Sequence, residues 1–423
     1  MIFKNLKGGD KMSKSTGGLH LLIKNRNFLL LFFGRLVSSV GSAIFIIAIL
    51  WSAAAEIGGV GAVSTVLSTI AVTNIIFSPF AGVWADRWKK KNILVITDLI
   101  SGGILILLGI FFGTYFYQIW VLIITIFGLQ ICGTLFGPAL LSLIPIMVND
   151  DELSQANAMI SMTDRLSQLI GMAIGGVIVS LVGIKWAILI DGLTFIFSAV
   201  SEMFIKAEEK GRKKVEARKT GLIFSDIKEG FKVIWTNVQL KGLITLETLD
   251  DFFGTTIFVF LPVLASEILK VGPGEYGIMQ TMLGAGSFIT AFVLSSIKEI
   301  KMKYVALMLS SVLAGVFLAS LGIVNSYIYV LIALLMLGVM TEIGNINENL
   351  LIQRITPENT RGRVFALRST IDNSLRPFSY AFAGIMAVFF SLKSLFFVFG
   401  IITSILGIFY LLIPYQLKKR NVF

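Results

Sequence analysis

The stretch that decides the fold class is GVWADRWKKK, residues 82–91, which lies between two long apolar runs. Five of the six residues from Asp86 to Lys91 are charged, although only 14% of the whole chain is charged. An apolar run of about 18 residues or more is long enough to cross a bilayer as a helix. The stretch is therefore expected to be a polar hinge between two membrane-crossing helices.

The composition favours a protein with many membrane spans and excludes several kinds of site. Of the 423 residues, 56% are hydrophobic, which is more than a soluble domain of this size can cover with polar surface. The single cysteine (Cys132) and single histidine (His20) exclude an intrachain disulfide, a Cys/His zinc site and a Ser-His-Asp triad within the spans. The chain has no G-x-x-x-x-G-K-[ST] phosphate loop, so ATP is not the expected energy source. No cofactor, metal site or catalytic residue is expected.

The apolar runs predict an all-α polytopic membrane protein with twelve transmembrane helices. Each run can cross about 30 Å of hydrocarbon at about 1.5 Å per residue. The predicted spans are 27–50, 61–84, 93–114, 118–147, 156–183, 186–205, 238–266, 275–297, 304–324, 327–352, 364–390 and 393–415.

The distribution of Lys and Arg predicts the orientation in the membrane. Both termini and the even-numbered hinges together carry 29 of these residues, whereas the opposite hinges carry three, Lys185, Lys270 and Lys393. Basic residues accumulate on the cytoplasmic side, so both termini are expected in the cytoplasm. The net charge of +11 then reflects topology and contact with membrane lipid, and no nucleic acid is expected as a partner.

A weak internal repeat divides the chain into two halves. Residues 158–176 align with 366–384 at an offset of 208, with identical Ala, Ser, Asp and Gly at four positions. Both segments fall in the fifth span of a half, which is typical of transporters built from repeated bundles. The expected parts are a cytoplasmic tail (1–26), a six-helix bundle (27–205), a central cytoplasmic loop (206–237), a second six-helix bundle (238–415) and a cytoplasmic tail (416–423).

The hinge stretch resembles the signature of the major facilitator superfamily, G-x-L-A-D-R-x-G-R-K, with Trp84 in place of Leu and Lys89 in place of the second Gly. The resemblance implies the major facilitator fold. It also implies a conformational latch between the two halves, formed by Gly82, Asp86, Arg87, Lys90 and Lys91. The alternative is a plain basic hinge that only sets topology.

Two further segments bear on the mechanism that the resemblance implies. Span 5 is similar to the antiporter pattern G-x-x-x-G-P-x-x-G-G and keeps Gly171, Gly175 and Gly176, with Met172 in place of Pro. Glycines four residues apart share a helix face and permit close packing, so ordinary helix packing is the alternative to an exporter motif. Gln130 stands in span 4 where proton-coupled members often carry Arg, which puts their usual proton relay in doubt.

Charged residues within the spans are candidates for binding a proton or a substrate, because a charge at the bilayer centre costs about 2.5–3.5 kcal/mol on insertion scales. Glu247, Asp250 and Asp251 fall at i, i+3 and i+4 of span 7 and share one helix face. Mutual repulsion is expected to keep a proton on at least one of them. The alternative is a hydrated cluster at the membrane edge. Glu342 lies near the middle of span 10.

Other charges within spans have simpler expected roles. Arg35 of span 1 is expected to pair with a carboxylate, either across the interface between the halves or elsewhere. Asp372 and Arg376 are expected to pair at i, i+4. Asp98 and Asp191 are expected to cap or pair near the span starts.

The predicted function is secondary active transport, specifically proton-coupled export of amphipathic or cationic drugs by alternating access. Segments 138–158 and 353–367 resemble the macrolide-efflux-like branch of bacterial drug exporters. A bacterial inner or plasma membrane, a small amphipathic substrate, protons and a monomer are expected. The alternatives are an importer or lipid flippase of the same fold, or a membrane sensor that does not transport.

Overall fold

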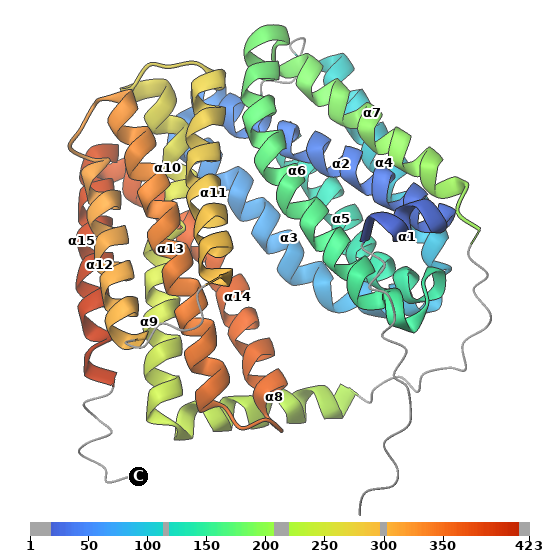
Figure 1. Cartoon of the computed structure of the whole chain (residues 1–423). Coiled ribbons are helices and arrows are strands. Elements are labelled where there is room, and N and C mark those ends of the chain that lie inside the picture. The colour runs from blue at the N-terminus through green and yellow to red at the C-terminus, as the bar shows by residue number, and fades with distance from the viewer. Residues whose placement is uncertain (1–17, 113–117, 207–219, 297–302, 414–423) are drawn as a thin grey trace, which may run out of the picture.

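The computed structural model describes residues 18–112, 118–206, 220–296 and 303–413, and within these ranges every regular element is a helix (Figure 1). Residues 1–17 of the predicted N-terminal tail, the whole predicted C-terminal tail and residues 207–219 of the central loop lie outside the described residues. The side chains of residues 18–19, 83, 86 and 220–227 also lie outside the description.

The N-terminal half contains the first six predicted spans. Its membrane-length helices are α2 (Arg26–Ser52), α3 (Gly59–Arg87), α4 (Lys90–Phe111), α5 (Ile119–Met147), α6 (Leu153–Val182) and α7 (Ile184–Met203). Three short elements accompany them: α1 (Gly18–Lys24), the π-helical turn η1 (Ala53–Gly58) and the 3₁₀ turn η2 (Asp150–Glu152). Gly59 has a φ of 56°, which permits the sharp junction between η1 and α3.

The C-terminal half repeats this plan. Its membrane-length elements are α9 (Val238–Gly254) continued by α10 (Ile257–Val263) and η3 (Leu264–Ile268), α11 (Pro273–Ser295), α12 (Lys303–Ser320), α13 (Tyr327–Ile355), α14 (Arg361–Phe389) and α15 (Leu392–Phe409). Before them lies α8 (Thr220–Thr236), a helix that the sequence did not predict. Glu229 of α8 pairs with Arg363 at the start of α14 (2.7 Å), which fixes α8 to this half.

The predicted twelve spans and the all-α polytopic fold are confirmed. Ten helical stretches of the described residues are long and apolar enough to cross a membrane. One of them, Arg26–Gly82, contains both α2 and most of α3. Helix α14 is also long enough to cross a membrane, but it contains five charged residues: Arg361, Arg363, Arg368, Asp372 and Arg376. Because of these charges it is not among the ten apolar stretches.

The two halves share one apolar core at one end of the molecule only. We call the end that carries α1, the α3–α4 hinge and α8 the hinge end, and the opposite end the far end. A single buried cluster at the far end combines residues of both halves, such as Ile47 and Val63 with Leu261 and Ala383. Towards the hinge end, each half has its own separate cluster.

Two pairs of helices hold the halves together at the far end. Helix α6 packs on α11, where a Cβ atom added to Gly277 would lie 2.7 Å from Gly176 Cα. Helix α14 packs on α3, where Gly384 lies against the Ser64 side chain. Small residues at these positions allow the helix backbones to approach closely.

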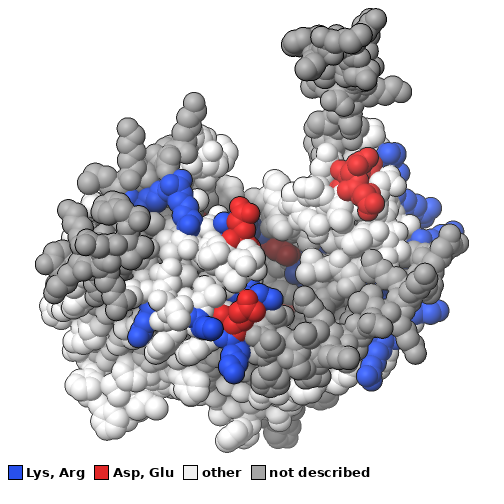
Figure 2. Space-filling view, turned by 90° about the horizontal axis from the view of Figure 1, so that it is seen from below, with Lys and Arg blue, Asp and Glu red and all other residues white. Residues whose placement is uncertain are grey.

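The hinge end is open between the halves. A cavity of about 520 Å³ lies between residues 67–79 of α3 and residues 369–380 of α14. Figure 2 views the molecule from this end and shows a hollow near the middle of the face, with acidic side chains beside it and within it. Closure at the far end with an opening at the hinge end corresponds to one of the two states that alternating access requires.

Candidate functional site

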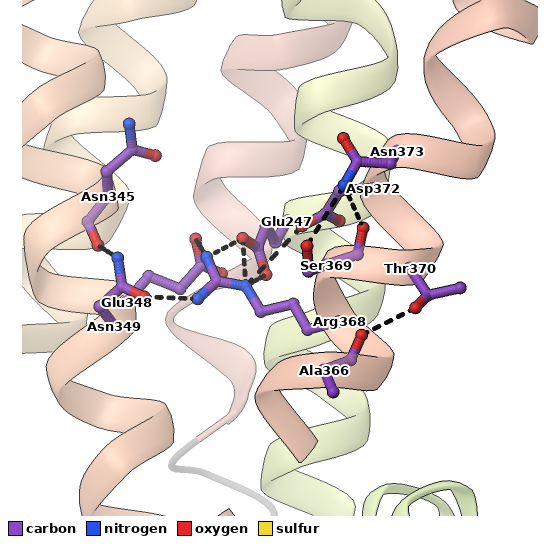
Figure 3. Close-up of polar contacts among 10 residues, drawn as sticks. All are labelled: Glu247, Asn345, Glu348, Asn349, Ala366, Arg368, Ser369, Thr370, Asp372 and Asn373. Atoms are coloured by element: carbon purple, nitrogen blue, oxygen red, sulfur yellow. Dashed lines mark hydrogen bonds and ion pairs between the residues drawn. The ribbon is translucent and has the colours of Figure 1, made fainter. Parts of the chain in front are cut away.

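The centre of the C-terminal half is a buried arginine surrounded by carboxylates (Figure 3). Arg368 reaches from α14, and its Nε lies 2.6 and 2.7 Å from the two carboxylate oxygens of Glu247 on α9. Its Nη1 donates to Asn349 Oδ1 (2.6 Å), and Nη2 lies 3.9 Å from Glu348 Oε2 on α13. Asp372 Oδ2 lies 4.0 Å from Nε. One guanidinium therefore faces three carboxylates.

The three carboxylates predicted on one face of span 7 line one cavity beside this arginine. Glu247, Asp250 and Asp251 all contribute to the wall of a cavity of about 280 Å³ inside the C-terminal half. Ser311 of α12 donates to Asp250 Oδ2 (3.1 Å), while Asp250 Oδ1 is buried and accepts no hydrogen bond from the described residues. Because Glu247 is 7% exposed, the alternative of a hydrated cluster at the membrane edge does not describe it.

Glu342 lies apart from this cavity. It is half-buried, sixteenth of the 29 residues of α13, and is absent from the residues lining the 280 Å³ cavity. The cation that acts on it electrostatically is Arg165 of α6, in the other half. Glu342 therefore faces the interface between the halves, while Glu247, Asp250 and Asp251 face the interior of one half.

The centre of the N-terminal half is also built on an arginine. Arg35 Nε of α2 lies 2.9 Å from Asp164 Oδ1 of α6, and Ser39 donates to the same oxygen (3.3 Å). The guanidinium also lies 5.2 Å from the ring centroid of Phe136. Of the two expectations for Arg35, pairing across the interface is not what the structure shows, since Asp164 belongs to the same half.

A second and larger cavity, about 620 Å³, opens beside Arg35. Gln130 lines it, so this residue faces the same space as Arg35, although its side chain makes no hydrogen bond among the described contacts. Asp98 and Asp191 line it as well. Asp191 accepts from Thr194 of its own helix (3.1 Å), as a locally paired residue would. Asp98 is buried and does not cap α4, so of its two expected roles, capping or pairing near the span start, capping is wrong.

Glycine contacts in α6 account for the span 5 pattern. A Cβ at Gly171 would meet Ala43 and Val40 of α2, and one at Gly175 would lie 3.0 Å from the backbone of Ile44. Gly171 and Gly175 thus pack α6 within its own half. Gly176 faces the other way, against the backbone of residues 273–277 in α11. The pattern therefore serves both internal packing and closure of the far end.

Of the predicted latch residues, Gly82 and Arg87 are exposed, whereas Lys90 and Lys91 are half-buried. Lys91 Nζ donates to Met203 O (2.6 Å). Lys90 Nζ lies 3.3 Å from Trp88 O. Arg87 is exposed, and open space surrounds the position of a Cβ at Gly82. The side chain of Asp86 lies outside the description. The latch expected at Gly82, Asp86, Arg87, Lys90 and Lys91 stays a prediction.

Sequence reasoning missed Arg368 and Glu202. Arg368 was counted with the basic residues of the preceding hinge because it lies seven residues from Arg361. The sequence feature that could have identified Arg368 is its position one turn before Asp372, in a helix that must cross the membrane. Glu202 of α7 is fully buried, and neither carboxylate oxygen has a hydrogen-bond partner among the described residues. No group of residues within the description is arranged to hold a metal ion.

Two similar halves of membrane-length helices, each with an ion pair beside a cavity, define a transporter of the major facilitator type. The chain belongs to the transmembrane secretion effector family of that superfamily, which it matches over residues 21–388. It is thus a multi-pass membrane transporter and not an enzyme.

The relatives include named exporters. The chain is 27% identical to the putative bacilysin exporter BacE of Bacillus subtilis over 306 residues, which covers 70% of this chain and 74% of the relative. It is 22% identical to macrolide efflux protein A of Streptococcus pyogenes over 360 residues, covering 84% and 87%. Among solved structures, the nucleoside transporter NupG superposes with a TM-score of 0.73 at 12% identity, covering 92% of this chain and 98% of that one. The last similarity concerns the fold alone.

Proposed function

We propose that the protein is a proton-coupled exporter of amphipathic or cationic compounds. The proton coupling is supported mainly by the 280 Å³ cavity, where Glu247, Asp250 and Asp251 meet beside Arg368 and Arg376. Carboxylates this close in a buried site interact strongly, so a proton that enters or leaves changes the charge of the whole cluster. Such a cluster can bind a proton in one state of the transporter and release it in the other.

The direction of transport is supported by the relatives. Both the bacilysin exporter and the macrolide efflux protein carry export in their names. We infer the same direction of transport, and an amphipathic substrate, for this protein. The basic residues at the hinge end support a cytoplasmic position for this end by the positive-inside rule. The open hollow would then admit substrate from the cytoplasm of a bacterium, across its plasma membrane.

The transport step is a rocking of the two halves. Opening the far end requires separation of α6 from α11 and of α3 from α14, where the contacts involve small residues. Closing the hinge end would bring the latch residues Gly82, Asp86 and Arg87 towards the other half. Glu342, which faces α6 across the interface, would experience a different electrostatic environment in each state.

Efflux in proteoliposomes tests the coupling. We expect the variant Asp250→Asn/Asp251→Asn to lose uphill efflux against an imposed pH gradient and to keep downhill substrate exchange at equal pH. The matched control is Glu358→Gln, which neutralises an exposed carboxylate at the hinge end. If the double variant still pumps uphill with an unaltered pH profile, the proton is carried elsewhere.

Dye accumulation in cells separates export from the alternatives. An exporter lowers the accumulation of a fluorescent substrate only while the proton gradient stands, so a protonophore abolishes the effect. An importer raises accumulation, and a sensor that does not transport leaves it unchanged.

A further inference from the structure

The two halves contain cavities of different size and different chemistry. The cavity in the C-terminal half measures about 280 Å³, whereas the one in the N-terminal half measures about 620 Å³. Sites for drug-sized molecules occupy about 300–1,000 Å³ and combine apolar walls with a few polar groups. The larger cavity fits this description: its wall includes aromatic and aliphatic residues (Phe45, Ile49, Phe195) together with hydroxyl and amide groups (Ser42, Asn74, Gln130).

One group on this wall has an unused hydrogen-bonding capacity. Asp98 lies in the middle of α4 and is 3% exposed, and it lines the cavity. Its Oδ2 accepts no hydrogen bond from the described residues. A buried carboxylate is costly unless it is paired or hydrogen-bonded, so a ligand group that donates to this oxygen would be strongly favoured.

The charged groups around Asp98 favour the binding of a cation. Arg35 is the cation that acts on Asp98 electrostatically, but its Nε donates to Asp164 instead. Glu202 and Asp191 also interact with Asp98 electrostatically, and both are acidic. With Asp191 also on the wall, acidic groups outnumber basic ones around the cavity.

We propose that the cavity of the N-terminal half binds the substrate through a protonated amine, with Asp98 as the counter-ion. The ammonium group pairs with the Asp98 carboxylate, and the apolar part of the substrate packs against Phe45 and Phe195. A metal ion is a poor occupant, because the described residues offer no group of ligands arranged to hold one. This inference rests on the proposed function and assigns its two ligands to different halves. The substrate binds in the N-terminal half, and the proton binds in the C-terminal half.

Binding to the purified full-length protein in phosphatidylcholine nanodiscs tests this assignment. The probes are dansylcadaverine, a fluorescent amphipathic primary amine, and its N-acetyl derivative, which lacks the positive charge. We expect the wild-type protein to bind the amine more tightly than the acetylated probe. Asp98→Asn should weaken binding of the amine about tenfold or more and leave the acetylated probe unchanged. Glu358→Gln, far from both cavities, is the control.

A second variant tests the cavity without removing a buried charge. Gly133 lines the cavity, and a Cβ there would meet no atom within 4 Å. Gly133→Leu should therefore fill part of the space without disturbing the fold and weaken both probes.

The proposal would be overturned by equal binding of the two probes to the wild-type protein, or by no saturable binding of the amine. An equal loss of both probes in Asp98→Asn would also overturn it, because that result describes a residue that supports the fold or carries a proton. Unchanged binding in Gly133→Leu would exclude this cavity. The assay contains no proton gradient, so its outcome is independent of whether transport is proton-coupled.

Discussion

Arg368 is the residue whose loss should damage the protein most. Its guanidinium contacts Glu247 through several short hydrogen bonds, and the two side chains are 11% and 8% exposed. Arg368→Gln removes the cation and leaves Glu247 buried with Glu348 and Asp372 nearby. Breaking a buried ion pair by removing one partner costs about 3–5 kcal/mol.

A matched substitution in the other half should cost much less. The pair of Arg35 with Asp164 is more open, with side chains 29% and 43% exposed. Pairs with this exposure contribute about 0–1 kcal/mol, so Arg35→Gln should lower the unfolding temperature only slightly. The double variant Glu247→Gln/Arg368→Gln should recover part of the loss, because the cost of the single variant comes mainly from the unpaired carboxylate.

Thermal unfolding of the purified variants in lipid nanodiscs, followed by tryptophan fluorescence, measures this order. We expect the unfolding temperature to fall most in Arg368→Gln, less in the double variant and least in Arg35→Gln. If Arg368→Gln unfolds at the same temperature as Arg35→Gln, the guanidinium is not the charge that stabilises the centre of the C-terminal half, and the reasoning fails.

Three further predictions concern movement and orientation. Asp86→Asn should abolish efflux in vesicles while leaving insertion and expression intact; unchanged efflux would make the stretch a plain topology signal. Gly277→Leu places a side chain against Gly176 and should prevent closure of the far end, so transport should be lost, whereas Gly103→Leu, where a Cβ meets no atom within 4 Å, should retain it. A cysteine introduced into the 206–232 segment of a cysteine-free variant should react with a membrane-impermeant label only from the cytoplasmic side, and reaction only from outside would reverse the proposed orientation.

The fold was predictable because the signal for each span is local. The length and apolar character of a run decide whether it crosses the membrane, so the span predicted at 118–147 appears as α5, Ile119–Met147. Helix α8 gives no such signal, since its 17 residues are fewer than a typical membrane span and include four charged residues. The interruption of span 7 at Thr255–Thr256 was also missed, because apolar residues continue on both sides of it.

The site was predictable only in part, because its contacts join distant segments. The periodicity of α9 correctly brought Glu247, Asp250 and Asp251 to one cavity. The partner of Glu247 is 121 residues away, and no local pattern indicates it. The position of Asp98 near the start of a span predicts capping or pairing there, whereas tertiary packing against α7 buries it.

The two ion pairs join corresponding helices of the two halves with opposite polarity. In the N-terminal half, Arg35 lies on the first long helix and Asp164 on the fifth; in the C-terminal half, Glu247 lies on the first and Arg368 on the fifth. Each pair therefore connects the first and the fifth long helix of its own half. The far-end contacts between the halves instead involve a shared apolar core and close glycine contacts, which can separate without leaving a buried charge unpaired. Both ion pairs thus lie within a half, and the interface that a rocking transporter must open contains neither of them.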